Sequence, residues 1–323
     1  MARRTVTSVE IDGRALQLSN LDKVLWPEDG YTKGDLIEYY RAVAGYLLPY
    51  LQGRPLTLQR FPDGVQGPSF FEKDAPRATP DWVRTLLVPA EYGRRGEVCF
   101  IMCDDEPTLV FVANLASIVL HVWTSREPEL DHPDVMLFDL DAGERCSVAR
   151  LGRVAVCFYE VLDEIGLRPL VKSTGGAGLH VMVPLEPRYS YDTIKAFAEL
   201  IARRVHVTMP GDTTLQRATA KRPDDLVYLD YVQVGRGKTL VAPYSVRART
   251  AAPVSMPLGW EEVRGMTRRR GKDTQKENAR YTMTNVPKLL AQGTGIWSAG
   301  AQRPQRLETA FRKAQRAWQE TQG

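Results

Sequence analysis

The sequence predicts an α/β or α+β fold in which mixed sheets are flanked by helices. Short apolar runs of strand-like composition alternate with longer segments in which apolar residues recur at helical spacing. Two short runs, residues 170–173 and 179–184, flank a glycine-rich turn, which is typical of an antiparallel hairpin. Hairpins mixed with helices disfavour a doubly wound parallel sheet and indicate a mixed one.

Strands are expected where β-branched and aromatic residues form short runs between turn residues. We expect them at residues 55–61, 98–102, 108–112, 135–141, 170–173, 179–184, 226–232 and 239–243. The last two runs are expected to pair with each other through a turn that contains Gly235 and Gly237.

Helices are expected where apolar residues recur every three to four positions. Thr32 and Asp35 have the spacing of a capping box and stand in front of such a series. A longer amphipathic segment, Ser147–Ile165, ends before Gly166. The expected helices are residues 36–48, 114–122, 147–165, 191–205 and 306–319.

Composition indicates the broad class of protein. The chain of 323 residues is 43% hydrophobic and 25% charged, which is typical of a globular protein with a sizeable core. It has no run of about 18 apolar residues and no apolar signal region, so we expect a cytoplasmic protein without a membrane segment. The four cysteines lack paired metal-site spacing and are expected to be reduced and mostly buried: Cys99, Cys103, Cys146 and Cys157.

Positive charge gathers at the C-terminal end. Residues 261–323 contain 13 Lys or Arg against 6 Asp or Glu, so the remaining residues contain 30 of the 43 basic and 33 of the 39 acidic ones. This basic part suits a polyanionic partner, and a solvated helical tail explains the charge equally well. The most polar stretch, residues 264–280, is expected to be a loop and not a boundary between two folded domains.

Two carboxylates end an apolar strand in the stretch VMLFDLDAGE. Side chains alternate along a strand, so Asp139 and Asp141 share a face. They repel each other, and a divalent cation with oxygen ligands removes the conflict. A turn in which one Asp caps the next helix is the alternative for this pair alone. Asp230, inside the apolar run LVYLDYVQ, adds a third carboxylate and favours a two-metal site for phosphoryl transfer.

The stretch KSTGGAGLHVMVP carries a glycine-rich turn between two strands. Its backbone N–H groups and hydroxyls can form an anion-binding nest, although a plain turn is more common. His180, after the turn, is either a core residue or a phosphate donor. Lys238 and Arg247 follow in VGRGKTLVAPYSVRAR, where the planar guanidinium group is suited to a triphosphate. With the three acids, these residues form the set expected of a nucleotidyltransferase.

With these residues in view, the sequence resembles the archaeo-eukaryotic primase superfamily, and within it the polymerase domain of bacterial ligase D and its stand-alone relatives. The motifs that carry the resemblance run in order along nearly the whole chain: LSNLDKVLWP, YTKGDLIEYY, RPLTLQRFPDG, FFEK, LFDLDAGE, STGGAGLHVMVPL, VYLDYVQ and TLVAPYSVRAR. The resemblance implies a primase-type fold in one catalytic domain over residues 1–323. Its parts are a 5′-phosphate-binding part at about 1–130, a catalytic part at about 131–260 and a basic part at about 261–323.

The resemblance also assigns roles to individual positions. The positions of metal ligands, which imply two Mn²⁺ or Mg²⁺ ions, are matched by Asp139, Asp141 and Asp230. Positions that bind the incoming nucleotide are matched by Thr174, Gly175, His180, Gln233, Lys238, Arg247, His121 and, in a loop of different length, Arg222. Positions that bind DNA are matched by Asn20, Lys23 and Lys33, for a 5′-phosphate, and by Phe70 and Phe71, for template bases.

Local sequence bears on the DNA positions as well. Lys33 lies in the first turn of an expected helix, where N–H groups attract anions, and Lys23 follows Asn20 in what we take as another helix start. Phe70 and Phe71 are neighbours in a strand, so we expect at least one of them to be buried.

Two positions depart from the family pattern. Ala177 stands in the glycine turn where relatives often have Lys, and Gln59 stands where many have a basic residue. We expect catalysis to be retained and nucleotide affinity to be altered.

The implied activity is metal-dependent, template-directed synthesis by a primase-polymerase in non-homologous end joining. The implied substrates are gapped or broken DNA with a 5′-phosphate and NTP or dNTP, with ribonucleotides preferred. A Ku-like protein and a separate DNA ligase are the implied partners, and the bacterial nucleoid is the implied location. A two-metal nuclease and a replicative primase are the alternatives, while the presence of all three acids disfavours a binding module with a degenerate site.

Overall fold

The computed structural model describes residues 5–94, 96–269 and 273–319. Within them the chain forms two units, each built from three separate stretches. Unit 1 takes the chain up to Pro128, Thr239–Ser255 and Tyr281–Thr294. Unit 2 takes Glu129–Lys238, Met256–Arg280 and the chain from Gly295. The single domain in three parts stays a prediction.

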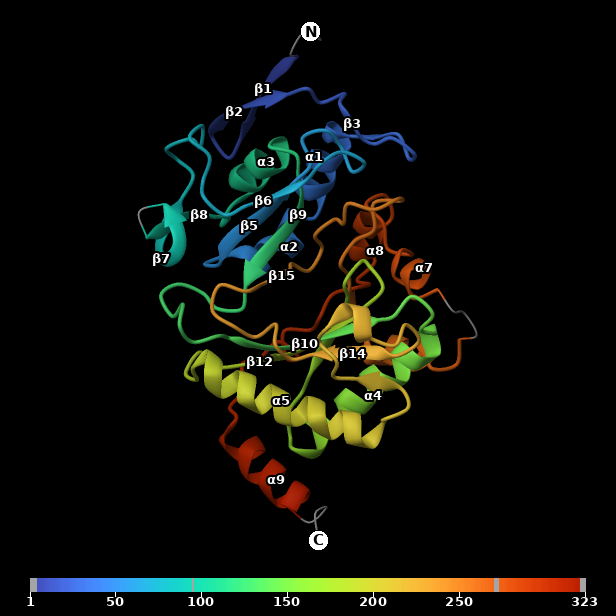
Figure 1. The fold of residues 1–323 in the computed structure, drawn as a ribbon. Helices are drawn as coiled ribbons and strands as arrows, with labels where there is room; N and C mark the ends of the chain where they lie inside the picture. The colour runs from blue at the N-terminus through green and yellow to red at the C-terminus, as the bar shows by residue number, and fades with distance from the viewer. Residues whose placement is uncertain (1–4, 95, 270–272, 320–323) are drawn as a thin grey trace. The chain divides into compact units, whose positions relative to one another are not determined.

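Unit 1 is built on an antiparallel sheet in the order β15-β9-β5-β8-β7, with β6 paired to β5 (Figure 1). The strands of this sheet are β5 (Pro55–Arg60), β6 (Phe70–Glu72), β7 (Thr85–Arg94), β8 (Glu97–Met102), β9 (Ser117–Trp123) and β15 (Thr239–Val241). Two smaller pairs are formed by β1 (Val6–Ile11) with β2 (Arg14–Ser19) and by β3 (Val24–Trp26) with β4 (Tyr31–Thr32). The helices are α1 (Lys33–Ala42), α2 (Ala44–Leu51), α3 (Glu106–Asn114) and α8 (Val286–Ala291).

Unit 2 is built on a mixed sheet in the order β13-β14-β10-β12-β11-β16. Its strands are β10 (Val135–Ala142), β11 (Leu170–Ser173), β12 (Leu179–Pro184), β13 (Thr213–Thr214), β14 (Val227–Asp230) and β16 (Pro257–Leu258). Its helices are α4 (Val148–Glu164), α5 (Tyr191–Thr208), η1 (Thr219–Lys221), α6 (Trp260–Met266), α7 (Thr274–Asn278) and α9 (Glu308–Gln319). Only β13 and β14 pair in parallel among the described strands, so the predicted mixed sheet is confirmed.

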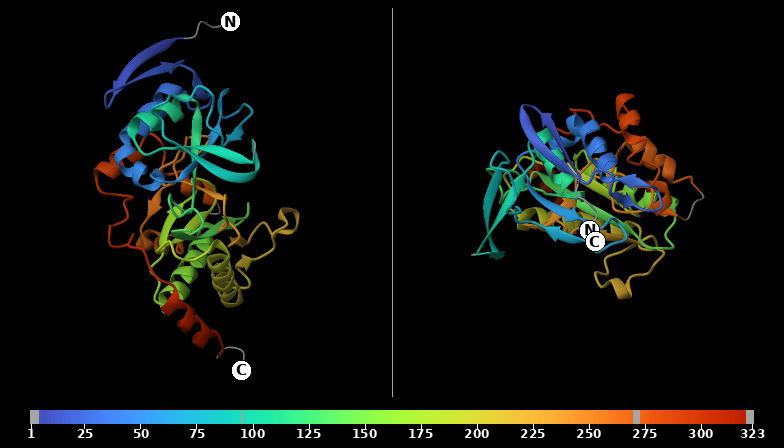
Figure 2. Two further views of the ribbon diagram at one scale, coloured as in Figure 1. Left: turned by 90° about the vertical axis from the view of Figure 1, so that its left-hand side faces the viewer. Right: turned by 90° about the horizontal axis from the view of Figure 1, so that it is seen from above.

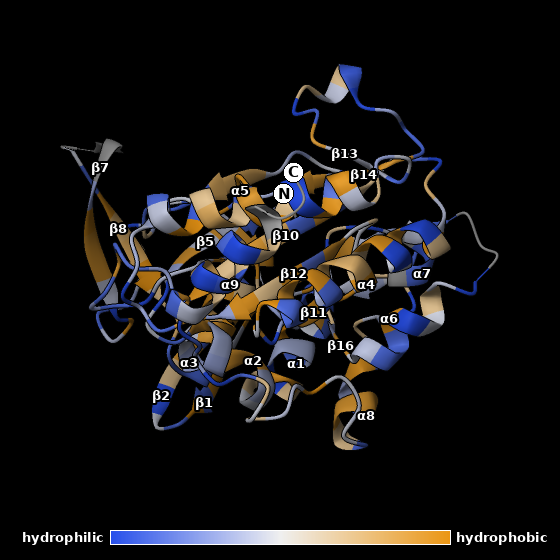
Figure 3. Cartoon of the chain, turned by 90° about the horizontal axis from the view of Figure 1, so that it is seen from below, coloured by the Kyte–Doolittle hydropathy of each residue, from blue (hydrophilic) through white to orange (hydrophobic). Residues whose placement is uncertain are grey.

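Helices α4 and α5 cover one face of the unit 2 sheet (Figure 1). Phe138 of β10 packs on Phe158 of α4, with ring centroids 4.8 Å apart. Figure 3 shows the hydrophobic residues of both helices interleaved with hydrophilic ones, as expected of helices with one buried side. Ser147 and Ser190 cap the two helices, each accepting a hydrogen bond from the backbone N–H three residues on. Because Phe138 faces these helices, its neighbours Leu137 and Asp139 face the other side of the sheet.

The predictions for residues 108–112 and 114–122 were wrong in type. The first segment lies in helix α3, and the second forms strand β9. The Asp105 side chain accepts from Thr108 N at 2.9 Å, and Pro107 occupies the first turn, so local capping outweighs the β-branched composition of the helix. Ala116, with φ 57°, turns the chain into the strand.

Three further expectations need correction. The expected helix at residues 36–48 is divided at Val43 into α1 and α2, although its capping box at Thr32 and Asp35 is present. Strands β14 and β15 do not pair with each other, because β14 joins β10 and β15 joins β9. The polar stretch 264–280 contains α7 and the end of α6, with residues 270–272 outside the described part.

Two other expectations concern the cysteines and the absence of a membrane segment. Cys103, Cys146 and Cys157 are buried and Cys99 is partly buried, and none forms a disulfide within the described residues. Among the helices of the described part, each is too short or too polar to span a bilayer.

Candidate active site

Strand pairing places four of the predicted site residues in one region of unit 2. Asp139 of β10 lies directly opposite Asp230 of β14 on one side and opposite His180 of β12 on the other. Directly paired residues share a face of a sheet, and so do residues two apart in one strand. Asp139, Asp141, Asp230 and His180 therefore share the face that helices α4 and α5 leave uncovered.

The three acids affect one another electrostatically. Burial, and then the charges of Asp139 and Asp230, raise the pKa of Asp141 to about 7. Burial and Asp139 also raise the pKa of Asp230, although its carboxylate accepts from Val232 N at 2.9 Å. Alternation along one strand predicted the repulsion between Asp139 and Asp141, and the observed strand register adds Asp230 to it.

Basic side chains lie against two of these acids. His180 Nε2 is 3.4 Å from Asp139 Oδ1, and Arg222 Nη1 is 3.8 Å from Asp141 Oδ2. In this arrangement no group of three or more His, Cys, Asp or Glu side chains of the described residues is positioned to hold a metal ion. The donor chemistry nevertheless fits a hard divalent cation, because three mutually repelling carboxylates offer oxygen ligands on one face.

The glycine-rich turn between β11 and β12 is closed by Thr174. Its Oγ1 accepts from Gly176 N at 3.2 Å and Gly178 N at 3.3 Å and donates to Gly178 O at 3.1 Å. Gly175 has φ 68°, a conformation that favours glycine. Gly178 is required for space, since a Cβ there would lie 2.5 Å from Leu140 O. The turn is thereby fixed against β10 between Asp139 and Asp141.

Arg222 lies in a long loop between β13 and β14 that projects from unit 2 in Figure 2. Its guanidinium group stacks 3.5 Å from the centroid of the Tyr228 ring. It also donates to Gln216 O and Arg217 O, both at 2.9 Å. The loop conformation therefore holds Arg222 beside Asp141.

Gln233 and Lys238 follow β14. Lys238 Nζ donates to Val232 O at 2.5 Å and forms part of the lining of a cavity of about 330 Å³. Burial lowers the pKa of the Lys238 ammonium, Asp230 opposes this shift, and Arg217 and Lys195 add to it. Lys195 lines the same cavity, a position that the sequence analysis missed because it lies on the distant helix α5.

Lys172 is another residue that the sequence analysis missed. It lies opposite His180 and is fully buried, with Nζ 3.4 Å from Ser173 O. A row of polar side chains thus crosses four neighbouring strands, in the order Lys172, His180, Asp139 and Asp230. The available signal was a lysine in the apolar run LVKS, because a buried ammonium group is costly without partners.

In unit 1, His121 lies in β9 opposite Thr57 of β5 and opposite Val241 of β15. The ring of Phe71 packs edge-on against the His121 ring, with centroids 5.5 Å apart. Thr57 Oγ1 is buried and has no hydrogen-bond partner within the described residues. The predicted positions His121 and Phe71 are therefore neighbours.

The expectation that Phe70 or Phe71 is buried was wrong. Their residues are 44% and 59% exposed. Strand β6 has only three residues and pairs with the end of β5, whose last two residues are only half-buried. The Arg60 guanidinium lies 5.3 Å from the centroid of the Phe70 ring.

The predicted 5′-phosphate residues lie near the start of unit 1. Lys33 is buried, and its ammonium donates to Asn114 Oδ1 at 2.9 Å and Asn114 O at 3.0 Å. The exposed Lys23 pairs with Asp63 at 3.1 Å. Asn20 has φ 53° and precedes strand β3, so the expected helix start at this point was wrong.

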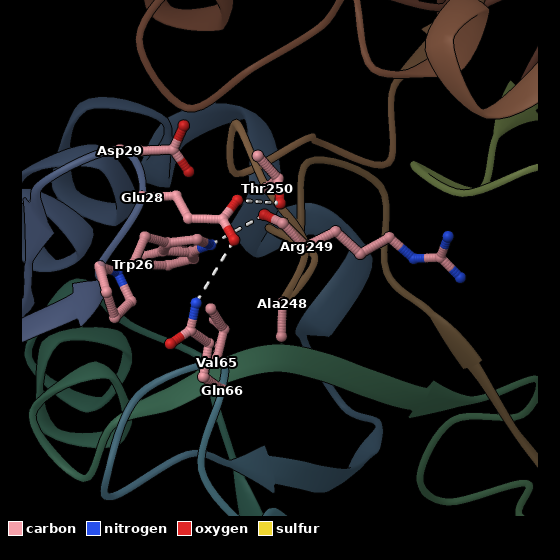
Figure 4. A pocket seen from close by; sticks show the side chains of 9 residues that line it. Trp26, Glu28, Asp29, Val65, Gln66, Ala248, Arg249 and Thr250 are labelled. Atoms are coloured by element: carbon pink, nitrogen blue, oxygen red, sulfur yellow. Dashed lines mark hydrogen bonds between the residues drawn. The ribbon is translucent and has the colours of Figure 1, made fainter.

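A cavity of about 170 Å³ lies on unit 1 beside Trp26 (Figure 4). Trp26 Nε1 donates to Arg249 O at 3.0 Å, and Thr250 Oγ1 donates to Glu28 Oε2 at 3.0 Å. Figure 4 shows the Arg249 side chain pointing away from these groups. The carboxylates of Glu28 and Asp29 among the lining residues make this cavity unsuited to a phosphate.

Comparisons with known proteins match most of the chain. A family model described as "LigD, primase-polymerase domain" matches residues 32–297. The "Multifunctional non-homologous end joining DNA repair protein LigD" of Mycobacterium tuberculosis is 35% identical over 254 residues, which are 76% of this chain and 33% of that protein. The "Multifunctional non-homologous end joining protein LigD" of Pseudomonas aeruginosa is 30% identical over 300 residues, which are 92% of this chain and 34% of that protein. This chain therefore spans about a third of the length of these relatives.

The fold is matched by a solved structure. The "Polymerase Domain from Mycobacterium tuberculosis Ligase D in complex with DNA" aligns with a TM-score of 0.77 at 31% identity. The alignment covers 87% of this chain and 96% of the other. The α/β fold predicted from the sequence, and the resemblance on which its primase type rested, are confirmed.

Proposed function

Because the chain belongs to the LigD primase-polymerase domain family, we propose that it is a template-directed nucleotidyltransferase that fills short gaps or extends broken DNA ends. The observation that carries the proposal is the group of acids on one face of the unit 2 sheet, with Asp230 directly opposite Asp139 and Asp141 two residues further along. Their mutual repulsion is relieved by cations, and cations of this kind serve phosphoryl transfer.

Asp139, Asp141 and Asp230 would hold two Mn²⁺ or Mg²⁺ ions. When bound, such ions supply activation of the primer 3′-hydroxyl and neutralisation of the departing pyrophosphate. Since the pKa of Asp141 is raised to about 7 without metal, this carboxyl group would release a proton when it becomes a ligand at neutral pH. His180 and Arg222, which lie beside these acids, would turn towards the phosphates of the nucleotide.

The incoming nucleotide would be bound by polar and cationic side chains together with the glycine-rich turn. We assign the triphosphate to Thr174, Gly175, His180, Lys238 and Arg247. Further nucleotide contacts are assigned to Gln233, His121 and Arg222, which lies beside Asp141. The cationic side chains would neutralise phosphate charge. The N–H groups of Gly176 and Gly178 donate to Thr174 Oγ1, so contact of these N–H groups with a phosphate would require these hydrogen bonds to be exchanged.

DNA would be bound by the exposed and basic residues of unit 1. Phe70 and Phe71 are exposed aromatic side chains of the kind on which bases stack. Lys23 and Lys33, with Asn20, would bind a 5′-phosphate, which requires the present partners of both ammonium groups to be exchanged. The salt dependence of DNA binding should therefore be steep.

The biological setting follows from the relatives. Their names place them in non-homologous end joining. We assign this chain to the same repair process at the bacterial chromosome, with ribonucleotides preferred and with a Ku-like protein and a DNA ligase as partners.

Primer extension on a DNA with a one-nucleotide gap tests the proposal. The downstream strand carries or lacks a 5′-phosphate, and NTP or dNTP is supplied with Mn²⁺ or Mg²⁺. We expect template-matched extension that is greatest with the 5′-phosphate, NTP and Mn²⁺. Shortening of the primer would instead indicate a nuclease, and products made without a primer would indicate a replicative primase.

One variant and its control test whether the acids are needed for extension. Asp139→Asn should abolish extension and leave DNA binding intact. Glu144→Gln changes an exposed carboxylate just beyond β10 and should extend like the wild type. Extension by Asp139→Asn would contradict the assignment of the acids.

A further inference from the structure

We propose that the hydroxyl groups of Tyr40 and Ser245 are positioning groups that hold His121 and Arg247 in a fixed relation to each other. The proposal rests on the proposed function, because it assigns His121 and Arg247 to nucleotide binding. Tyr40 and Ser245 have no assigned role there. All four residues belong to unit 1.

The Tyr40 hydroxyl joins the two segments that carry these residues. It donates to Ile118 O in β9 at 2.7 Å and accepts from Val246 N at 3.2 Å. Ile118 stands three residues before His121, and Val246 stands immediately before Arg247. The Tyr40 hydroxyl oxygen, on helix α1, is therefore hydrogen-bonded to both segments.

Ser245 makes a second connection between the same segments. Its Oγ accepts from Leu120 N at 2.9 Å, and Leu120 is the neighbour of His121 in β9. Ser245 Oγ also lies 3.4 Å from the Tyr40 hydroxyl oxygen. Tyr40 and Ser245 are both fully buried, so these bonds are made away from water, where losing a partner is costly.

The segment that carries Arg247 has an irregular backbone. Strand β15 ends at Val241, opposite His121, and Tyr244 then adopts φ 64°, which is uncommon for a residue with a side chain. Beyond the strand, hydrogen bonds from buried side chains supplement the backbone ones in fixing this path. Tyr39, the neighbour of Tyr40 in α1, donates to Tyr244 O at 2.8 Å.

The two tyrosines differ in what their hydroxyls connect. Tyr39 fixes the segment at Tyr244, whereas Tyr40 binds both the segment and β9. Both are buried, with exposures of 3% and 0%, and both lie in the same turn of α1. Loss of either hydroxyl costs a buried hydrogen bond, but only loss of the Tyr40 hydroxyl frees Arg247 to shift relative to His121.

The test compares Tyr40→Phe and Ser245→Ala with the control Tyr39→Phe. For each protein, Kd for NTP is measured by calorimetry, and KM and kcat are measured on the gapped DNA. Affinity for the DNA end and the urea unfolding midpoint are measured in parallel. Each variant removes one hydroxyl group and introduces no new polar atom.

We expect Tyr40→Phe and Ser245→Ala to raise Kd and KM for NTP by about 3- to 10-fold, the effect of one buried hydrogen bond. The kcat value and DNA-end affinity should change by less than about twofold. The double variant should raise Kd and KM for NTP by about the larger of the two single effects and no more, because both hydroxyls act through one network. Tyr39→Phe should lower the unfolding midpoint to a similar degree with little change in KM.

Equal effects of Tyr39→Phe and Tyr40→Phe on KM would overturn the proposal, as would a Tyr40→Phe protein that is less stable but binds NTP normally. The wild-type measurement separates this outcome from failure of the proposed function. If the wild type binds no NTP, the proposed function fails. If it binds NTP and Tyr40→Phe binds equally well, only the positioning role fails.

Discussion

Replacing Asp141 with Asn should stabilise the metal-free protein at pH 8. Burial and the neighbouring acids raise the pKa of Asp141 from 3.8 to about 7 in the folded chain. Between these two values the folded state holds a proton that the unfolded state has lost, so stability falls as the pH rises through this window. Above about pH 7 the wild type has lost the full amount of unfolding free energy that this group can remove. Asn avoids the loss because its amide does not titrate.

The size of the effect follows from the pKa and the exposure of the side chain. The change from 3.8 to about 7 corresponds to a ceiling of about 4 kcal/mol, at about 1.4 kcal/mol per pH unit. The Asp141 side chain is 50% exposed, and water screens the repulsion, so we expect about 1–2 kcal/mol. The gain should be smaller at pH 5, where the folded wild type keeps the proton.

Urea unfolding in the presence of a chelator measures this difference. Wild type, Asp141→Asn and the exposed control Glu144→Gln are compared at pH 5 and pH 8. Addition of Mn²⁺ at pH 8 should then stabilise the wild type more than Asp141→Asn. A stability gain of Asp141→Asn that is equal at both pH values would refute the electrostatic reasoning.

Three other substitutions test separate parts of the site. Phe71→Ala should weaken DNA binding by about 1–3 kcal/mol without changing the unfolding midpoint, because the residue is exposed; unchanged binding in a fluorescence titration would exclude stacking. Ala177→Lys should lower the KM for NTP severalfold by adding an ammonium group at a half-buried position of the glycine turn, and an unchanged KM would count against a phosphate contact there. Gly178→Ala should lower both extension and the urea midpoint, because its Cβ would meet Leu140 O at 2.5 Å. Gly45→Ala, with no atom within 4 Å of its Cβ, is the control, and equal behaviour of the two variants would contradict the close approach.

The acids show what the sequence could predict about the site. The alternation in VMLFDLDA predicted a strand with Asp139 and Asp141 on one face, and strand β10 has this form. Asp230 was identified as costly in an apolar run, but its place opposite Asp139 depends on pairing between residues 91 positions apart. Periodicity describes one strand at a time, so the family resemblance and the structure were needed to bring the acids together. Lys172 was missed for the same reason.

The errors have local physical causes. The segment from Thr108 to Val112 has strand-like composition, yet the Asp105 cap and Pro107 in the first turn make it helical. The expectation that Phe70 or Phe71 is buried assumed that one face of their strand packs against the core. Strand β6 is instead a short addition to the end of β5, and both side chains are exposed. In both cases neighbouring residues or strands decided the outcome, and the pattern within the segment did not.

The interrupted make-up of the two units has a consequence for synthesis on the ribosome. Unit 1 needs strand β15 and the segment with Arg247, which follow all of Glu129–Lys238 along the chain, and it also needs Tyr281–Thr294. Neither unit can therefore be completed until most of the polypeptide has been translated. Until β15 has been synthesised, one edge of strand β9 lacks its partner strand. Domains whose strands pair over long separations in sequence fold slowly. Truncated chains should accordingly be prone to aggregation, so deletion is a poor way to study either unit alone.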